Sequence, residues 1–97
     1  MEKQQVLDIL SEHWQEISQR YDVLYLALFG SVARGEASTG SDIDLLVAFK
    51  GRADFDRFMD LKFFLEDLLM TEVDLVTDRA IRPRLRPGIE REAIRVA

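Results

Sequence analysis

The stretch Val-Leu-Tyr-Leu-Ala-Leu-Phe at residues 23–29 constrains the fold most strongly, because it is an unbroken, uncharged and mainly apolar run of strand length. Such a run is typical of a strand that is buried within a sheet. Gly30-Ser31 ends it. A second strand is predicted over residues 42–49 and a shorter third strand over residues 73–76. The chain therefore has enough apolar strand sequence to build the centre of a small sheet.

Helical periodicity occupies much of the remaining sequence. Apolar residues at spacings of three and four predict an amphipathic helix over residues 3–20. The same spacing predicts a helix over residues 55–69 with Asp54 as its N-cap. The buried stripe of that helix is expected to contain Phe55, Phe58, Met59, Leu61, Leu65, Leu68 and Leu69. Short helical segments are predicted over residues 31–37 and 88–95, with a loop over residues 38–41 and chain breaks at Pro83 and Pro87.

This order of elements predicts an α/β fold of α+β-like character, with a small mixed sheet of three to four strands and helices packed on it. A full helix between the second and third strands suits a parallel crossover. The short link between the first and second strands fits an antiparallel return better. Because the chain has 97 residues, we expect residues 1–97 to form a single domain.

Composition excludes several kinds of chemistry. The chain has no cysteine and only one histidine, His13, which excludes disulfides and thiolate metal sites and argues against Ser-His catalysis. Any bound metal must be held by oxygen ligands, as Mg²⁺ or Mn²⁺ is. The sequence has no signal peptide pattern and no apolar run near the roughly 18 residues that span a bilayer, so we expect a cytoplasmic protein without a membrane segment.

Charge is unevenly distributed along the chain. The net charge is −5, yet residues 79–97 hold six arginines against two glutamates, a local net of +4. The first 78 residues therefore carry −9, which argues against general nucleic-acid binding. The arginine-rich segment fits either an acidic partner surface or RNA, or it is a set of solvated arginines at a helix end.

Asp42 and Asp44 are the most informative pair of side chains. In a strand, residues two apart point to the same face, while Ile43 points to the other. A parallel neighbouring strand beginning at Val73 would place Asp74 beside them. Three such carboxylates can hold two magnesium ions about 3.5–4 Å apart, as in two-metal phosphoryl chemistry. Alternatively, Asp42 caps a loop end and Asp44 is an edge charge that deters aggregation.

Gly30-Ser31 follows the first strand and begins a possible helical turn. Backbone N–H groups at such a junction, with the Ser31 hydroxyl, suit a phosphate, and Gly30 allows a close approach to the backbone. Arg34 could contact phosphates, or it could form a salt bridge to Glu36 or another nearby acid.

Gly30-Ser31, Asp42-Ile43-Asp44 and the later Asp74 together resemble the nucleotidyltransferase superfamily that includes DNA polymerase beta. The stretches Leu-Phe-Gly-Ser-Val-Ala-Arg-Gly-Glu (28–36) and Ser-Asp-Ile-Asp-Leu-Leu-Val (41–47) resemble its minimal nucleotidyltransferase (MNT) branch. The resemblance implies the nucleotidyltransferase fold, with two Mg²⁺ ions bound by the three aspartates. Asp74 would also help to deprotonate the acceptor, and Gly30 and Ser31 would hold the triphosphate of ATP.

The MNT resemblance also implies a partner. Members of this branch are often paired with helical ribonuclease toxins of the HEPN class, so we expect an antitoxin that transfers AMP from ATP to a hydroxyl, typically of tyrosine, on such a toxin. A hetero-oligomer is expected, because a partner would complete a pocket that this short chain leaves open. Two alternatives stay open. In one, the acceptor is a small molecule such as an aminoglycoside; in the other, the chain neutralises its partner by binding alone.

Overall fold

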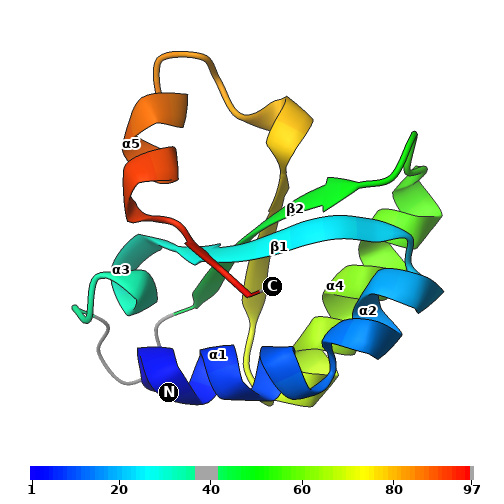
Figure 1. Ribbon diagram of the computed structural model, residues 1–97, viewed down its shortest axis with the longest axis horizontal. Helices are drawn as coiled ribbons and strands as arrows, with labels where there is room; N and C mark the ends of the chain where they lie inside the picture. The colour runs from blue at the N-terminus through cyan, green and yellow to red at the C-terminus, as the bar shows by residue number, and fades with distance from the viewer. Residues whose placement is uncertain (37–41, 97) are drawn as a thin grey trace.

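The computed structural model describes residues 1–36 and 42–96, which form a four-stranded mixed sheet with helices on both of its faces (Figure 1). The strands are β1 (Val23–Phe29), β2 (Ile43–Phe49), β3 (Val73–Thr77) and β4 (Ile94–Arg95). The helices are α1 (Lys3–Glu12), α2 (Trp14–Arg20), α3 (Gly30–Ala33), α4 (Phe55–Leu69) and α5 (Arg86–Glu92), with a 3-10 turn η1 (Asp78–Ala80). The loop expected over residues 38–41 lies outside the described residues. No helix in the described ranges has the length and apolar character needed to cross a membrane.

The sheet has the order β3-β2-β1-β4 and confirms the mixed sheet predicted from the sequence. β1 runs antiparallel to β2, as the short link between them indicated. β2 runs parallel to β3 through the α4 crossover, and in that register Asp44 lies opposite Asp74. β4 adds an antiparallel edge strand, in which Ile94 pairs with Leu28.

The main core lies between one face of the sheet and α1, α2 and α4, which group together in Figure 1. β2 contributes Ile43, Leu45 and Val47 to this core, and each of them is almost fully buried. Leu46 faces the other side, where a smaller cluster packs it with Ala27 and Ile81. Because side chains alternate along a strand, Asp44 also points to this second face, away from the main core.

Helix α4 positions β3 as well as covering the sheet. Asp54 accepts a hydrogen bond from the Arg57 backbone N–H at 2.8 Å, which confirms the predicted N-cap. Farther along the helix, the Glu66 carboxylate accepts from the Val73 backbone N–H at 3.0 Å, so the helix holds the beginning of β3. The predicted stripe is wrong at Phe55. This first residue of the helix is 65% exposed and lines a shallow groove instead of the core.

Several predicted boundaries differ from the structure, among them that of the helical segment predicted over residues 31–37, which is the shorter α3. The helix predicted over residues 3–20 is two helices joined at His13, where the ring Nδ1 lies 2.9 Å from the Ile9 carbonyl oxygen and competes for that helical acceptor. Asp42 lies just before β2 rather than within it. The segment predicted as a helix over residues 88–95 is α5 followed by strand β4. Its helix begins earlier, at Arg86, because Pro87 is tolerated in a first turn.

The C-terminal arginines divide into two groups. Arg86 donates to the Asp78 carboxylate at 2.8 Å and to the Asp78 carbonyl at 2.8 Å, so it ties α5 to η1. The Arg95 guanidinium lies over the Tyr25 ring, 4.5 Å from its centroid. Arg79, Arg82 and Arg84 are exposed. At least two of the six arginines therefore serve packing within the chain.

Candidate active site

Strands β2 and β3 bring Asp44 and Asp74 together. The two residues are direct partners in the parallel register, and the charge of Asp74 acts on the Asp44 carboxyl. Asp44 is half-buried, whereas Asp74 is exposed and lines, with Asp42, an open cleft of about 610 Å³ beside β3. The predicted juxtaposition of Asp44 with Asp74 is therefore present, and Asp42 lies at the rim of the same region.

The pKa of Asp44 is raised above its ordinary value. Burial is the largest cause, followed by the neighbouring Asp74 carboxyl and then by the charge of Asp42. The Arg34 guanidinium opposes these effects and lowers the pKa. The ionised form of the half-buried Asp44 carboxyl is therefore destabilised, and a nearby cation would stabilise it.

This raised pKa makes a prediction for stability. Asp44 holds its proton more tightly in the folded chain, so folding stability falls as pH rises from the ordinary pKa of 3.8 through the folded pKa. Asn does not ionise, so Asp44→Asn removes this loss of folding stability. In the presence of EDTA, we expect the Asn variant to be more stable than the unchanged chain near neutral pH, with the difference vanishing below pH 3.8. Urea denaturation across this pH range measures it, with exposed Asp60→Asn as the control. A difference that grows on acidification would contradict the assignment.

Gly30 meets the carboxylate pair at the end of β1. Its φ is +77°, a conformation that costs other L-residues energy. A Cβ atom at this position would overlap Oδ2 of Asp44 and lie only 2.8 Å from its Cγ. Glycine is therefore required twice over, for the backbone conformation and for the space that the Asp44 carboxyl occupies. The backbone junction predicted to bind phosphate lies directly against the predicted metal ligands.

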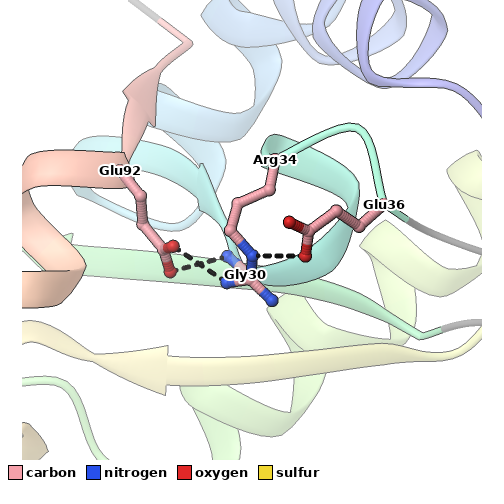
Figure 2. Close-up of polar contacts among 4 residues, drawn as sticks. All are labelled: Gly30, Arg34, Glu36 and Glu92. Atoms are coloured by element: carbon pink, nitrogen blue, oxygen red, sulfur yellow. Dashed lines mark hydrogen bonds and ion pairs between the residues drawn. The ribbon is translucent and has the colours of Figure 1, made fainter.

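A carboxylate from the C-terminal helix already contacts this junction (Figure 2). The Gly30 N–H donates to Oε1 of Glu92 at 3.1 Å, and Nη1 of Arg34 donates to Oε2 of Glu92 at 2.9 Å. Nε of Arg34 also donates to Glu36 at 2.9 Å, so the salt bridge considered for Arg34 is present. Ser31 lies half-buried in the first turn of α3. The sequence patterns did not identify Glu92 as part of this site, because it lies 62 residues from Gly30 and belongs to no motif.

The donor set fits a hard divalent cation. Asp42, Asp44 and Asp74 offer only carboxylate oxygens, the ligands that Mg²⁺ favours. Within residues 1–36 and 42–96, no three His, Asp or Glu side chains are gathered around one point as a finished metal site. Asp44 and Asp74 repel each other when both are ionised, and a cation between them would relieve that repulsion. These two carboxylates are therefore the best-placed ligands for a metal.

Comparison with known proteins agrees with this geometry. Residues 10–96 match the family described as "Nucleotidyltransferase domain". The chain belongs to that family. It is 41% identical over 93 residues to "Putative protein adenylyltransferase MJ0128" of Methanocaldococcus jannaschii, with 95% of each chain covered. It is 34% identical to "Protein adenylyltransferase MntA" of Thermococcus cleftensis, covering 96% of this chain and 94% of that protein. This nucleotidyltransferase therefore aligns with these relatives along nearly their whole length.

Solved structures share the same fold. A structure named "putative minimal nucleotidyltransferase" superposes with a TM-score of 0.82 at 41% identity, covering 97% of this chain and 95% of that one. A toxin-antitoxin structure with AMP-PNP gives a TM-score of 0.74 at 22% identity, over 90% and 72% of the two chains. A complex of a tri-AMPylated Shewanella oneidensis HEPN toxin with its MNT antitoxin gives 0.68 at 19% identity, over 94% and 71%. The resemblance to the minimal nucleotidyltransferase branch is thus confirmed.

Proposed function

We propose that this nucleotidyltransferase transfers AMP from ATP to the hydroxyl group of a tyrosine side chain on a HEPN-type toxin. It thereby acts as the antitoxin of that toxin. The proposal rests on the Asp44–Asp74 carboxylate pair, in which Asp44 lies directly against Gly30, where a Cβ atom would overlap its carboxyl. If the aspartates bind the cation and the Gly30 backbone binds phosphate, both functions lie in one small volume. The names of the relatives, which describe protein adenylyltransferases, support AMP as the transferred group.

The residues have separate roles in the proposed reaction. Asp42, Asp44 and Asp74 would hold two Mg²⁺ ions, which supply charge neutralisation at the phosphates and at the attacking and leaving oxygens. Gly30 and Ser31 would orient the triphosphate through the backbone at the beginning of α3, and Arg34 would contribute positive charge. These fixed groups lower the activation barrier for transfer, because the entropy cost of aligning the acceptor with the α-phosphorus is met on binding.

The acceptor and ATP are the only reactants that the transfer step needs. The acceptor hydroxyl oxygen forms a bond to the α-phosphorus as the bond from that phosphorus to the β-phosphate oxygen breaks, and pyrophosphate leaves with the bonding electron pair. The hydroxyl proton passes to the Asp74 carboxylate, which is exposed at the open side of the pair. The more buried Asp44 is less accessible to an acceptor and keeps its role as a ligand.

The acceptor would approach through the open cleft beside β3. Asp42 and Asp74 line this cleft together with Lys62 and Thr71. A side chain presented by a second protein would enter it, and that protein would close the site from the solvent side. In this proposal the toxin partner and the nucleotide meet at the same carboxylates, and the two proteins form a hetero-oligomer.

The proposal predicts the acceptor of the reaction. The purified chain, its HEPN-type partner, ATP and Mg²⁺ are expected to give a partner whose intact mass increases by whole AMP units, with the modified residue located on tyrosine by peptide fragmentation. Asp42→Asn should remove the increase and exposed Asp60→Asn should retain it. An unmodified partner together with an adenylylated aminoglycoside would favour the small-molecule alternative. A stable complex without any modification would favour neutralisation by binding alone.

A further inference from the structure

Glu92 holds the same groups that the proposed function assigns to the triphosphate. Its two carboxylate oxygens accept separately, one from the Gly30 backbone N–H and the other from the Arg34 guanidinium (Figure 2). The side chain is only 26% exposed, so it lies in the junction between α5 and α3 and not free in solvent. The contact links the last residue of α5 to the end of β1 across 62 positions of sequence.

A carboxylate in this position resembles part of a phosphate group. It presents two anionic oxygens to one backbone N–H and one guanidinium, a pair of donors that also suits two phosphate oxygens. The Gly30 N–H has a single hydrogen, so it cannot donate fully to Glu92 and to a nucleotide at the same time. The two anions therefore compete for the donor.

Charge strengthens this competition. Arg34 is held by Glu36 and Glu92 together, and its charge also acts on Asp44. A triphosphate that entered while Glu92 kept its place would add negative charge beside these carboxylates with the nearby guanidinium already neutralised. Removal of the Glu92 side chain frees the Gly30 N–H and Nη1 of Arg34, while Nε of Arg34 stays paired with Glu36.

We propose that Glu92 is an internal competitor of the nucleotide, and that ATP binds by displacing its carboxylate from Gly30 and Arg34. This inference rests on the proposed function, which places the triphosphate at Gly30 and Ser31. In this displacement the Glu92 side chain leaves Gly30 and Arg34, while pairing between Ile94 and Leu28 holds the following backbone on the sheet. Glu92 thus sets the nucleotide affinity, since only the fraction of molecules with a released carboxylate can bind.

The test is nucleotide affinity, measured by calorimetry with Mg²⁺ and α,β-methylene ATP, whose α–β linkage is not broken by transfer. Glu92→Gln and Glu92→Ala are expected to bind about tenfold more tightly than the unchanged chain, the shift that loss of one charge-assisted competing contact produces. Glu90→Gln is the matched control, because Glu90 lies on the same helix but pairs with Arg86. Unchanged or weaker binding by both Glu92 variants would overturn the proposal. The contacts of Glu92 with Gly30 and Arg34 would then serve only to stabilise the fold.

A second measurement uses the unchanged chain, so it holds even if the variants fold poorly. The chain has five glycines, which makes the Gly30 amide easy to follow by NMR. Added nucleotide is expected to shift both the Gly30 amide and the Glu92 side-chain carboxyl resonance. A shift at Gly30 with an unmoved Glu92 carboxyl would mean that both anions bind together, against the proposal. If neither the unchanged chain nor any folded variant binds the nucleotide, the proposed function is overturned as well. If all of them bind it equally, only this inference is overturned.

Discussion

Asp44→Asn is expected to slow AMP transfer by at least on the order of 10²–10³-fold, the loss that follows removal of one electrostatic group from an active site. The variant loses a cation ligand from the more buried member of the Asp44–Asp74 pair. It keeps the size of the side chain, so the space beside Gly30 stays filled. Initial rates of partner labelling at saturating ATP measure the effect.

The control for this prediction separates lost chemistry from lost structure. Asp60→Asn makes the same chemical change on the exposed surface of α4 and is expected to transfer AMP at the normal rate. Asp44→Asn itself should melt no lower than the unchanged chain at neutral pH, because it removes a charge that burial and Asp74 disfavour. Rapid turnover by the folded Asn variant would remove Asp44 from the reaction.

Gly30→Ala is expected to lower the free energy of unfolding by about 3 kcal/mol and to abolish transfer. The positive φ costs a residue with a Cβ about 1–2 kcal/mol. Overlap with the Asp44 carboxyl adds about 1–3 kcal/mol, as overpacking does in other tightly packed sites. Either the β1 end or the Asp44 side chain must move, and both belong to the proposed site. Chemical denaturation and the labelling assay give the two readings.

Gly51→Ala isolates the contribution of the overlap. Gly51 also has a positive φ, +69°, but among the described residues beyond its two chain neighbours no atom lies within 4 Å of the Cβ that a substitution would add. It therefore carries the backbone cost alone, about 1–2 kcal/mol, and should leave transfer intact. Equal destabilisation by the two alanine substitutions would mean that the contact between Gly30 and Asp44 is unimportant.

The central parts of this fold follow from local sequence patterns. The apolar run at residues 23–29 and the pattern at residues 43–49 gave β1 and β2, because buried strands need continuous apolar sequence. A full helix before Val73 is what a parallel crossover requires, and the parallel register places Asp74 beside Asp44. The carboxylate pair was thus predictable because it depends on strand periodicity and one topological rule. Its metal-binding role stays a prediction.

Other features depend on contacts between distant segments and were not predictable. Ile94 was assigned to a helix, but pairing with Leu28 draws it into a strand, and nothing local in its sequence indicates that partner. Glu92 reaches Gly30 only because this strand fixes the end of α5 on the sheet. The kink at His13 arises from one ring nitrogen near the Ile9 carbonyl, which hydrophobic periodicity does not detect. Tertiary context decided each of these cases.

The most direct test of the central claim follows two labels on ATP. The chain and its HEPN-type partner are incubated with Mg²⁺ and ATP labelled at either the α- or the γ-phosphate. The α-label is expected to appear on the partner and the γ-label in released pyrophosphate, with both signals lost in EDTA and in Asp44→Asn. A γ-label on the partner would show a different phosphoryl transfer. No label on a partner that nevertheless forms a stable complex would contradict catalysis by this site.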